Sequence, residues 1–386
     1  MPFRRLPLVG GEGGQEQTSV LPVLWSHTLC SPGCRPSVLP TRAFILTCGP
    51  DYEKQKPRFK CSAEPCEAAP FCGQCRLAGA DFAVPGEYVM PELPEVETVA
   101  RTLAPCLEGR SLVRIEVLNP GTWQGPIAAE SLCERGPLPF AGTGRRGKLL
   151  LVCFEKGACL KQGGLPTCSE APELPEEEAV PLGLAFHLKM SGRLFAYPAG
   201  SAPEKHTRLI LHLDDGGMIF FDDARKFGYA RALTPAVLRG WDFWNKLGPE
   251  PFRLDDRAFA ARFRGRKSVI KSLLLDQSVI AGIGNIYADE SCFRAGIRPD
   301  APASSLSFAR LARLRAALVE VLEESIEACG SSIKDYRTAR GDAGAFQNAF
   351  RVYGRRGKNC LVCGSELRTC RVAGRTTTFC PTCQKG

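Results

Sequence analysis

The chain has 386 residues and a formal net charge of +9, and 44% of its residues are hydrophobic. This length allows two or three domains with a sizeable core, and no apolar run is long enough to cross a bilayer, which argues against an integral membrane protein. The 19 cysteines sit in a chain too large for the small secreted disulfide class and without a convincing signal peptide, so most are expected to be reduced thiols in a cytoplasm.

Residues 1–89 show Pro and Gly throughout and no sustained hydrophobic period, which predicts loop rather than helix or strand. The run CSAEPCEAAPFCGQC, Cys61 to Cys75, could bind a metal. The same run is also typical of translated upstream sequence that ends at an in-frame methionine. We favour a true start at Met90 over a genuine leader or a small metal-binding extension.

The stretch MPELPEVETVARTL, which begins at Met90, carries the most distinctive chemistry. If Met90 were the first residue and were removed, Pro91 would present a free secondary amine beside the carboxylate of Glu92. Such an amine can attack a sugar aldehyde carbon and form an iminium ion. Within a peptide bond the same nitrogen is an amide and is not a nucleophile. The alternative is an ordinary internal dipeptide that leads into a helix.

Hydrophobic periodicity after Pro91 predicts one helix and then strands. Leu93, Val96, Val99, Ala100 and Leu103 share one helical face, with Glu92 and Glu95 near the helix start. SLVRIEVLN and KLLLVCF predict strands, and LAFHLKMSGRLF predicts that the strand pattern resumes later. Between them, residues 156–183 form a Pro-rich acidic insertion, which we expect to project away from any polyanion bound to the protein.

From Trp241 onwards the pattern turns helical, in LDDRAFAARFRG and in LSFARLARLRAALVEVLEESIEACG. Between these lies LDQSVIAGIGNIYADESCFRAGI, where Gly282 and Gly284 break the helix and Asn285 is expected to be the N-cap of the next one. Free amides at such a helix start bind phosphate well, although a plain structural turn is the alternative. The later stretch SSIKDYRTARGDAGAFQNAFRVYG predicts a long irregular loop.

The last 56 residues contain a strong metal-ligand pattern. Cys360 and Cys363 are followed after sixteen residues by Cys380 and Cys383, which fits a four-thiolate structural zinc site rather than a disulfide. Cys370 falls outside this spacing. Because four protein ligands leave no open position, the zinc ion is expected to fold the module and not to catalyse. Residues 331–386 hold eleven Lys or Arg against three Asp or Glu, which suits a polyanion such as nucleic acid.

Three of these stretches together resemble a known family. MPELPEVETV, KSLLLDQSVIAGIGNIYADESCFRAGIRP and VYGRRGKNCLVCGSELRTCRVAGRTTTFCPTCQK are similar, in order, to segments of bacterial formamidopyrimidine-DNA glycosylase, and the resemblance runs from Met90 to the end. It implies an α+β multidomain fold. Residues 90–233 would form a catalytic β-sandwich flanked by helices, residues 234–345 a helix-two-turn-helix domain, and residues 346–386 a zinc-finger β-hairpin, with residues 1–89 an extension.

The resemblance also implies site residues. The catalytic set would be Pro91, Glu92, Lys148 and Arg375, and the DNA-binding set would be Met190, His206, Arg225, Phe227, Lys271, Asn285 and Lys334. Met190 and Phe227 would fill the gap left by a nucleotide turned out of the duplex, and Arg225 would bond the orphan base. Without the family, Met190 and Phe227 are more typical of core residues. Ala224 and Lys226 depart from the usual Pro and Arg of this loop.

The implied activity is base-excision DNA repair. A bifunctional glycosylase and abasic-site lyase would remove oxidised purines such as 8-oxoguanine and formamidopyrimidines through the Pro91 iminium, followed by β,δ-elimination, with one structural zinc ion as the only cofactor. The expected partner is double-stranded DNA with oxidised purines or abasic sites, the expected state a monomer, and the expected place the bacterial cytoplasm near the nucleoid. The alternatives are an endonuclease VIII-type enzyme for oxidised pyrimidines, or a non-catalytic zinc DNA-binding protein if residues 1–89 are retained.

Overall fold

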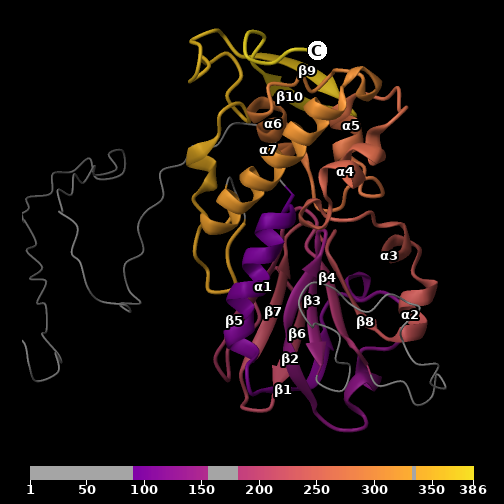
Figure 1. Ribbon diagram of the computed structural model, residues 1–386. Helices are drawn as coiled ribbons and strands as arrows, with labels where there is room; N and C mark the ends of the chain where they lie inside the picture. Colours follow the sequence, from indigo (N-terminus) through magenta and orange to yellow (C-terminus); the bar gives the residue numbers. More distant parts are fainter. Residues whose placement is uncertain (1–89, 155–180, 333–335) are drawn as a thin grey trace, which may run out of the picture. The chain divides into compact units, whose positions relative to one another are not determined.

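The computed structural model describes residues 90–154, 181–332 and 336–386 (Figure 1). The cysteine run at 61–75, nearly all of the acidic insertion 156–183, and Lys334 therefore lie outside the described residues. Within the described part of the chain, no helix combines the length and apolar character that a membrane span requires.

The first described element is helix α1, Leu93–Leu107. Glu92 and Glu95 form a reciprocal capping box at its start, where the Glu92 N–H donates to Glu95 Oε2 over 3.0 Å. The side chains predicted to share one face are buried, and most of them pack into the core of the β-sandwich. The helix predicted from the hydrophobic period after Pro91 is therefore confirmed.

Eight antiparallel strands follow, in the spatial order β5-β7-β6-β1-β2-β3-β4-β8. Their bounds are β1 Ser111–Val117, β2 Leu138–Arg146, β3 Leu149–Phe154, β4 Gly183–His187, β5 Gly192–Tyr197, β6 Thr207–Leu213, β7 Met218–Asp223 and β8 Tyr229–Leu233. Only two residue pairs, Ser111 with Pro139 and Leu112 with Leu138, join β1 to β2. This short junction lets the two four-stranded halves pack face to face around a shared core.

Strand β3 explains why KLLLVCF is continuously apolar instead of alternating. Leu150, Val152 and Phe154 point into the sandwich core beside α1. Leu149, Leu151 and Cys153 point the other way, towards the short helices α2, Pro235–Gly240, and α3, Asp242–Lys246. A strand covered on both faces needs apolar side chains at every position.

The prediction of one continuous strand in LAFHLKMSGRLF is wrong. Strand β4 ends at His187 and β5 begins at Gly192, with a turn between them in which Lys189 has a φ of 51°. A Cβ on Gly192 would lie 2.5 Å from the Leu188 carbonyl oxygen, so the turn closes only around glycine. Met190 consequently projects from a turn rather than from a strand.

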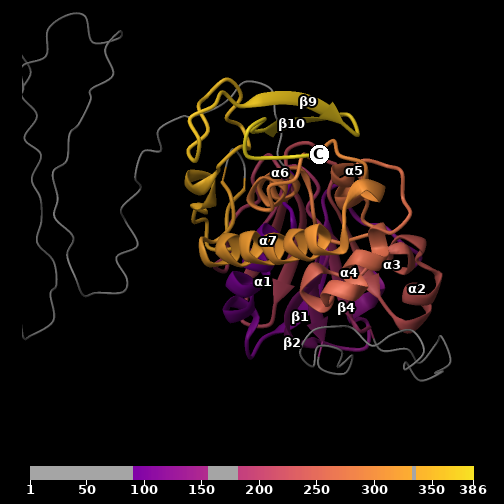
Figure 2. The ribbon, with the colours of Figure 1, turned by 45° about the horizontal axis from the view of Figure 1, so that its top comes forward.

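The helical region contains α4, Asp256–Phe263, α5, Ile270–Leu275, α6, Asn285–Arg294, and α7, Phe308–Glu327, with a shared apolar core (Figure 2). Short 3-10 turns occur at Pro120–Thr122, Glu130–Cys133, Pro251–Arg253, Ala303–Ser305 and Phe346–Ala349. Helix α6 starts at Asn285 and its N-cap is Gly284, so the expectation that Asn285 is the N-cap is off by one residue.

The chain ends in a hairpin of β9, Arg368–Val372, and β10, Arg375–Phe379. Ala373 and Gly374 form its two-residue turn with φ values of 47° and 72°, a left-handed pair that suits a tight hairpin. Helix α6 packs between this hairpin and α7 (Figures 1 and 2). The α+β architecture of β-sandwich, helical domain and zinc hairpin is confirmed.

Candidate active site

A cavity of about 720 Å³ opens where the sandwich, the helical domain and the β9–β10 turn meet. Most of the predicted catalytic residues line it or adjoin it: Glu92, Lys148 and Arg375 form part of its wall, and Pro91 is buried between Met90 and Glu92, which both line it. The remaining lining residues include Met190, Asn285, His187, Phe243, Leu247, Tyr353 and Thr376. Side chains more than 200 positions apart in the sequence thus share one cleft.

The Glu92 carboxylate is held by the start of helix α6. Its Oε2 accepts the Gly284 N–H over 2.7 Å and its Oε1 accepts the Ile286 N–H over 3.0 Å. A Cβ on Gly284 would lie 2.4 Å from the carboxylate carbon, so glycine is what permits this approach. Gly282, with a φ of 97°, would similarly meet Leu93 at 2.5 Å. Both glycines of GIGN therefore leave room for the residues at the start of α1, Gly282 for Leu93 and Gly284 for Glu92.

These contacts revise the interpretation of GIGN as a phosphate-binding helix start. Two of its amides are already paired with the carboxylate of Glu92 inside the same chain. A helix N-terminus favours any anion, and here a carboxylate satisfies the preference. The predicted turn between two helices is present, but the Gly284 and Ile286 amides are not free for DNA.

Burial shifts the pKa values of Glu92 and Lys148 in opposite directions, and the charge of each group opposes the shift of the other. Burial raises the pKa of Glu92 to about 7, against the ammonium of Lys148 and the two amides, which lower it. Burial also lowers the pKa of Lys148, while the carboxylates of Glu92 and Glu95 oppose that change. Near neutral pH, the Glu92 carboxyl therefore exchanges its proton readily, as a general acid or base requires.

A second buried carboxylate, Glu95, lies behind Glu92. It accepts the Tyr287 hydroxyl over 2.5 Å and the Ser331 N–H over 2.8 Å, and burial raises its pKa. Because Glu95 also accepts the Glu92 N–H, one carboxylate joins α1, α6 and the start of the loop after Gly330. The sequence placed Glu95 near the helix start but gave no sign of these distant partners.

Lys271, which was predicted to contact DNA, is held inside the protein. Its side chain is completely buried, and Nζ donates to Asp289 Oδ1 over 2.6 Å and to Thr377 Oγ1 over 2.7 Å. The Thr378 N–H donates to the other oxygen of Asp289 over 3.1 Å. Lys271 and Asp289 therefore fix strand β10 against the helical domain. This attachment places Arg375, at the beginning of β10, on the rim of the cleft.

Asn285, which the resemblance assigned to DNA binding, lines the cleft. Its Nδ2 donates to the Thr376 carbonyl over 3.2 Å, while its buried Oδ1 has no hydrogen-bond partner among the described residues. The side chain thus joins the α6 start to the hairpin and offers one unused acceptor to whatever enters the cleft. Tyr353 is also held in the cleft wall, because the buried Glu290 accepts its N–H over 2.8 Å.

His187 is a cleft residue that the sequence reasoning missed. It precedes Met190 by three positions in AFHLKM, and that proximity was the available signal. Burial and the nearby lysines lower the pKa of His187 to about 3, so the imidazole is neutral. Its Nδ1 accepts the Lys189 N–H over 3.1 Å, and its ring packs edge-on against Phe243.

Asp223 joins the loop that carries Met190 to the loop that carries Arg225 and Phe227. Its carboxylate accepts the Arg225 N–H over 3.1 Å, the Gly228 N–H over 2.6 Å and the Ser191 hydroxyl. Ser191 adjoins Met190, so both loops share one anchor. The Phe227 ring is 53% exposed, which is unlike a core residue, and the Arg225 guanidinium lies 5.0 Å from its centre.

Three other residues predicted to bind DNA, His206, Arg225 and Phe227, do not line the cleft. His206 is half-buried, and its Nδ1 is 3.4 Å from the Arg208 guanidinium, beside the Asp223 backbone. Lys334 lies outside the described residues.

The four predicted metal ligands gather at the base of the hairpin. The thiol sulfurs of Cys360, Cys363, Cys380 and Cys383 all lie within 4.8 Å of one another. Backbone N–H groups of Val362 and Cys383 point at two of these sulfurs over 3.5 and 3.4 Å. Four sulfurs at this spacing fit the tetrahedral shell of one zinc ion, whose Zn–S bonds are about 2.3 Å. One structural zinc ion is therefore the cofactor, as predicted.

Comparisons with known proteins agree with this geometry. Residues 90–230 match the formamidopyrimidine-DNA glycosylase N-terminal domain, residues 247–337 its H2TH domain, and residues 357–386 a zinc finger found in FPG and IleRS. The formamidopyrimidine-DNA glycosylase of Nitratidesulfovibrio vulgaris is 45% identical over an alignment that covers 77% of this chain and 100% of the relative. The chain belongs to the formamidopyrimidine-DNA glycosylase family.

Solved structures of the family support the same conclusion. The Lactococcus lactis Fpg in complex with DNA that contains an abasic site is 32% identical, with a TM-score of 0.63, and the match covers 76% of this chain and 100% of that one. The MutM (Fpg) protein of Thermus thermophilus is 36% identical, also with a TM-score of 0.63, over 76% of this chain and 98% of that one. The resemblance predicted from the three sequence stretches is confirmed.

Proposed function

We propose that this protein is a bifunctional base-excision enzyme that removes oxidised purines and then cuts the DNA strand at the abasic site. Its place among the DNA glycosylases of base excision repair follows from the family. Related structures with abasic-site DNA and with Fapy-dG DNA support both halves of the proposal. One observation carries it: the Met90–Pro91 bond lies at the cleft, beside Glu92 and Lys148.

In the proposed reaction, the free Pro91 nitrogen bonds to C1′ of the flipped nucleotide while the glycosidic bond breaks, and the base leaves with its electron pair and takes up the proton that the nitrogen loses. The carboxyl of Glu92 then gives its proton to the ring oxygen as the C1′–O bond breaks, which leaves an iminium ion. Loss of a proton from C2′ expels the 3′ phosphate, and a second elimination expels the 5′ phosphate. Lys148, which lines the same cleft, would act on the sugar.

The DNA-binding roles are proposals of the same kind. Arg375 would neutralise a phosphate at the rim of the cleft, and Asn285 would contact the backbone there. Met190, Phe227 and Arg225 would occupy the gap opposite the lesion, because the shared Asp223 anchor holds their two loops together. His206 and Lys334 keep their proposed DNA contacts. We propose a monomer in the bacterial cytoplasm near the nucleoid, acting on double-stranded DNA.

The domain division 90–233, 234–345 and 346–386 is also a proposal, and the family ranges 90–230, 247–337 and 357–386 support it. Known relatives match over essentially their whole length to the part of the chain that begins at residue 90. We therefore propose that the active form begins at Pro91, and that residues 1–89 are upstream sequence or an extension removed before catalysis.

Borohydride trapping tests the nucleophile. The full chain and a form with Pro91 at its amino terminus would each be incubated with duplex DNA that carries an abasic site and then reduced. A covalent adduct is expected from the Pro91 form and none from the full chain. An equal yield of adduct from the full chain, with intact mass showing residues 1–90 still attached, would exclude Pro91. Absence of adduct from both forms would favour the non-catalytic DNA-binding alternative.

Substrate class needs a separate measurement. The Lactococcus lactis protein has also been solved with DNA that contains an oxidised pyrimidine, so both base classes belong in the test. Single-turnover excision of 8-oxoguanine opposite cytosine should be faster than excision of an oxidised pyrimidine in the same sequence. The reverse order would favour the endonuclease VIII-type alternative.

A further inference from the structure

Lys148 sits at the tip of the β2–β3 hairpin, and one carboxylate from the helical side holds that tip. Glu250 Oε1 accepts the Gly147 N–H over 2.7 Å and lies 2.5 Å from the Arg145 guanidinium. The Glu97 carboxylate of α1 accepts a hydrogen bond from the Nε of the same guanidinium over 2.7 Å. The Arg145 side chain is only 9% exposed, so this pair of carboxylates compensates a nearly buried charge.

Glu250 is itself fixed by the segment around it. The Gly248 N–H donates to the Gln277 carbonyl over 2.8 Å, and the Ala281 N–H donates to the Pro249 carbonyl over 3.0 Å. A Cβ on Gly248 would lie 2.6 Å from the Ser278 carbonyl oxygen, so residues 248–250 lie tightly against the loop before α6. Gly147 faces that same loop, since its Cβ position is 3.3 Å from the Ala281 Cβ.

We propose that Glu250 is a positioning residue that sets where Lys148 stands in the cleft. It ties the hairpin tip to the loop whose next residues hold the Glu92 carboxylate, so the acid and the amine are placed by one rigid segment. Neither Glu250 nor Arg145 lines the cleft, so the effect passes through the backbone of residues 146–148. This inference rests on the proposed function of Lys148 and Glu92.

Three variants separate positioning from mere stability. Glu250→Ala removes both contacts, and Glu250→Gln keeps an oxygen for the Gly147 amide but loses the charge. Glu97→Gln is the matched control, because it weakens the Arg145 pairing without touching Gly147. Each would be made in whichever form of the chain gives the borohydride adduct. If the unsubstituted chain gives no adduct, the proposed function fails and the positioning of Lys148 is judged by structure determination of Glu250→Ala alone.

Single-turnover excision with saturating enzyme is expected to be about tenfold slower or more in Glu250→Ala, since small displacements of reacting groups cost large factors. DNA affinity should change by less than about twofold, and Glu250→Gln should recover part of the rate. The alkaline limb of the pH–rate profile should move to higher pH, because a displaced ammonium lowers the pKa of Glu92 less. An equal rate loss in Glu97→Gln, or a loss confined to DNA affinity with the limb unmoved, would overturn the proposal.

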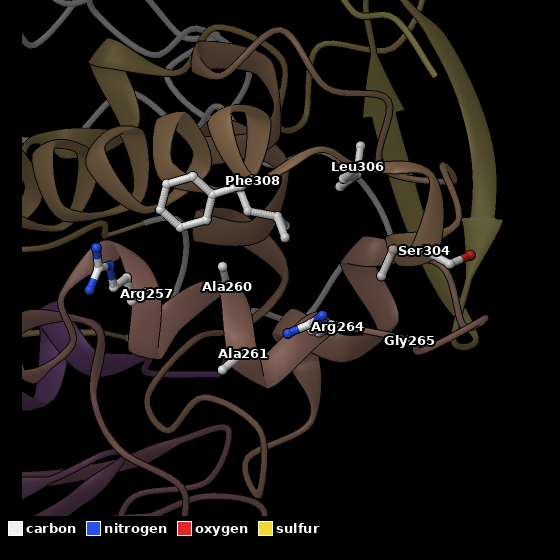
Figure 3. A pocket seen from close by; sticks show the side chains of 10 residues that line it. Arg257, Ala260, Ala261, Arg264, Gly265, Ser304, Leu306 and Phe308 are labelled. Carbon is white, nitrogen blue, oxygen red and sulfur yellow. The ribbon is translucent and has the colours of Figure 1, made fainter.

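A separate groove of about 600 Å³ lies between α4 and the start of α7 and shares no residue with the active-site cleft (Figure 3). Its floor is apolar, from Ala260, Ala261, Leu306 and Leu311, and the Phe308 ring over it is 55% exposed. Arg257 lies in the first turn of α4 and Arg264 directly follows its last residue (Figure 3), and neither side chain has an ion pair among the described residues.

We further infer that this groove docks an acidic peptide that carries a large apolar side chain. The two arginines, about 10 Å apart along a helix at 1.5 Å per residue, match carboxylates that flank an apolar anchor. An exposed aromatic ring beside an apolar floor needs an apolar occupant, which favours a peptide over the phosphates of DNA. The charge pattern of the groove therefore selects a partner protein with an acidic tail or loop.

Fluorescence anisotropy would test this with a labelled hexapeptide in which two acidic residues precede and two follow a central Leu-Phe pair. Binding to the full chain is expected, about tenfold weaker after Arg257→Glu with Arg264→Glu or after Phe308→Ser, and unchanged after Arg239→Glu on exposed α2. Excision activity should not change in any of them. Equal binding of a lysine-substituted peptide, absence of binding, or a chain dimer that Phe308→Ser abolishes would each overturn the proposal.

Discussion

Replacing Gly284 by alanine should displace the carboxylate of Glu92, the proposed catalytic acid, although Glu92 itself is unchanged. The added Cβ would lie 2.4 Å from both the carboxylate carbon and Oε1 of Glu92, whereas such contacts essentially never fall below 3.0 Å. The carboxylate must therefore move by at least 0.6 Å, the difference between these two distances. The carboxylate would weaken or lose the hydrogen bonds that it accepts from the backbone N–H groups of Gly284 and Ile286. Each is worth about 1.5–3 kcal/mol for a charged acceptor. We expect excision to slow about 100-fold.

Single-turnover excision of an oxidised purine would measure the effect, with Gly240→Ala as the control. Gly240 meets no atom within 4 Å at its Cβ position, so the same substitution there should leave the rate unchanged. Combining Gly284→Ala with Glu92→Gln should slow excision no further than Glu92→Gln alone, because both act on one group. A Gly284→Ala enzyme with the original rate would refute the claim that the GIGN glycines serve Glu92.

The other predictions concern charge, protons and zinc. Asp289→Ala should lower the free energy of unfolding by about 3–5 kcal/mol in denaturant titrations, because Lys271 would remain buried without its partner carboxylate. Adding Lys271→Met should restore part of the lost stability. An unchanged free energy of unfolding in Asp289→Ala would contradict a stabilising Lys271–Asp289 pair. Excision should slow as the pH rises through about 7, because the Glu92 carboxyl, whose pKa is raised to about 7, then loses the proton it donates; a pH–rate profile flat across that region would contradict this role. Cys380→Ser should lose zinc and should also lose either its folded structure or its DNA affinity. Cys370→Ser, which lies outside the ligand set, should keep its full zinc content by metal analysis. Full zinc content and normal DNA binding in Cys380→Ser would disprove the ligand assignment.

Local chemistry explains which parts of the fold the sequence could predict. The zinc site follows from cysteine spacing within 24 residues, and α1 follows from a hydrophobic period within one helix. Both depend on residues that are neighbours in the chain. The break before α6 was likewise predictable from two glycines, although the residue that starts the helix was misplaced by one.

Distant contacts explain what the sequence could not predict. Lys148 and Lys271 each stand just before a run of three leucines in the sequence, yet one faces the cleft and the other is buried against Asp289 and β10. The two glycines of GIGN suggested a phosphate site because the partner that fills it, Glu92, lies about 190 positions earlier. Glu250 gave no sequence signal at all, since its partners Arg145 and Gly147 belong to another domain.

Helix α6 is where these distant contacts converge. Its first amides hold Glu92, its Asn285 and Asp289 hold the hairpin that presents Arg375, and its Glu290 holds the backbone at Tyr353. Contacts within the described residues therefore place the groups around the Pro91 nitrogen, and cleavage of the Met90–Pro91 peptide bond is the chemical change that the proposed nucleophile requires.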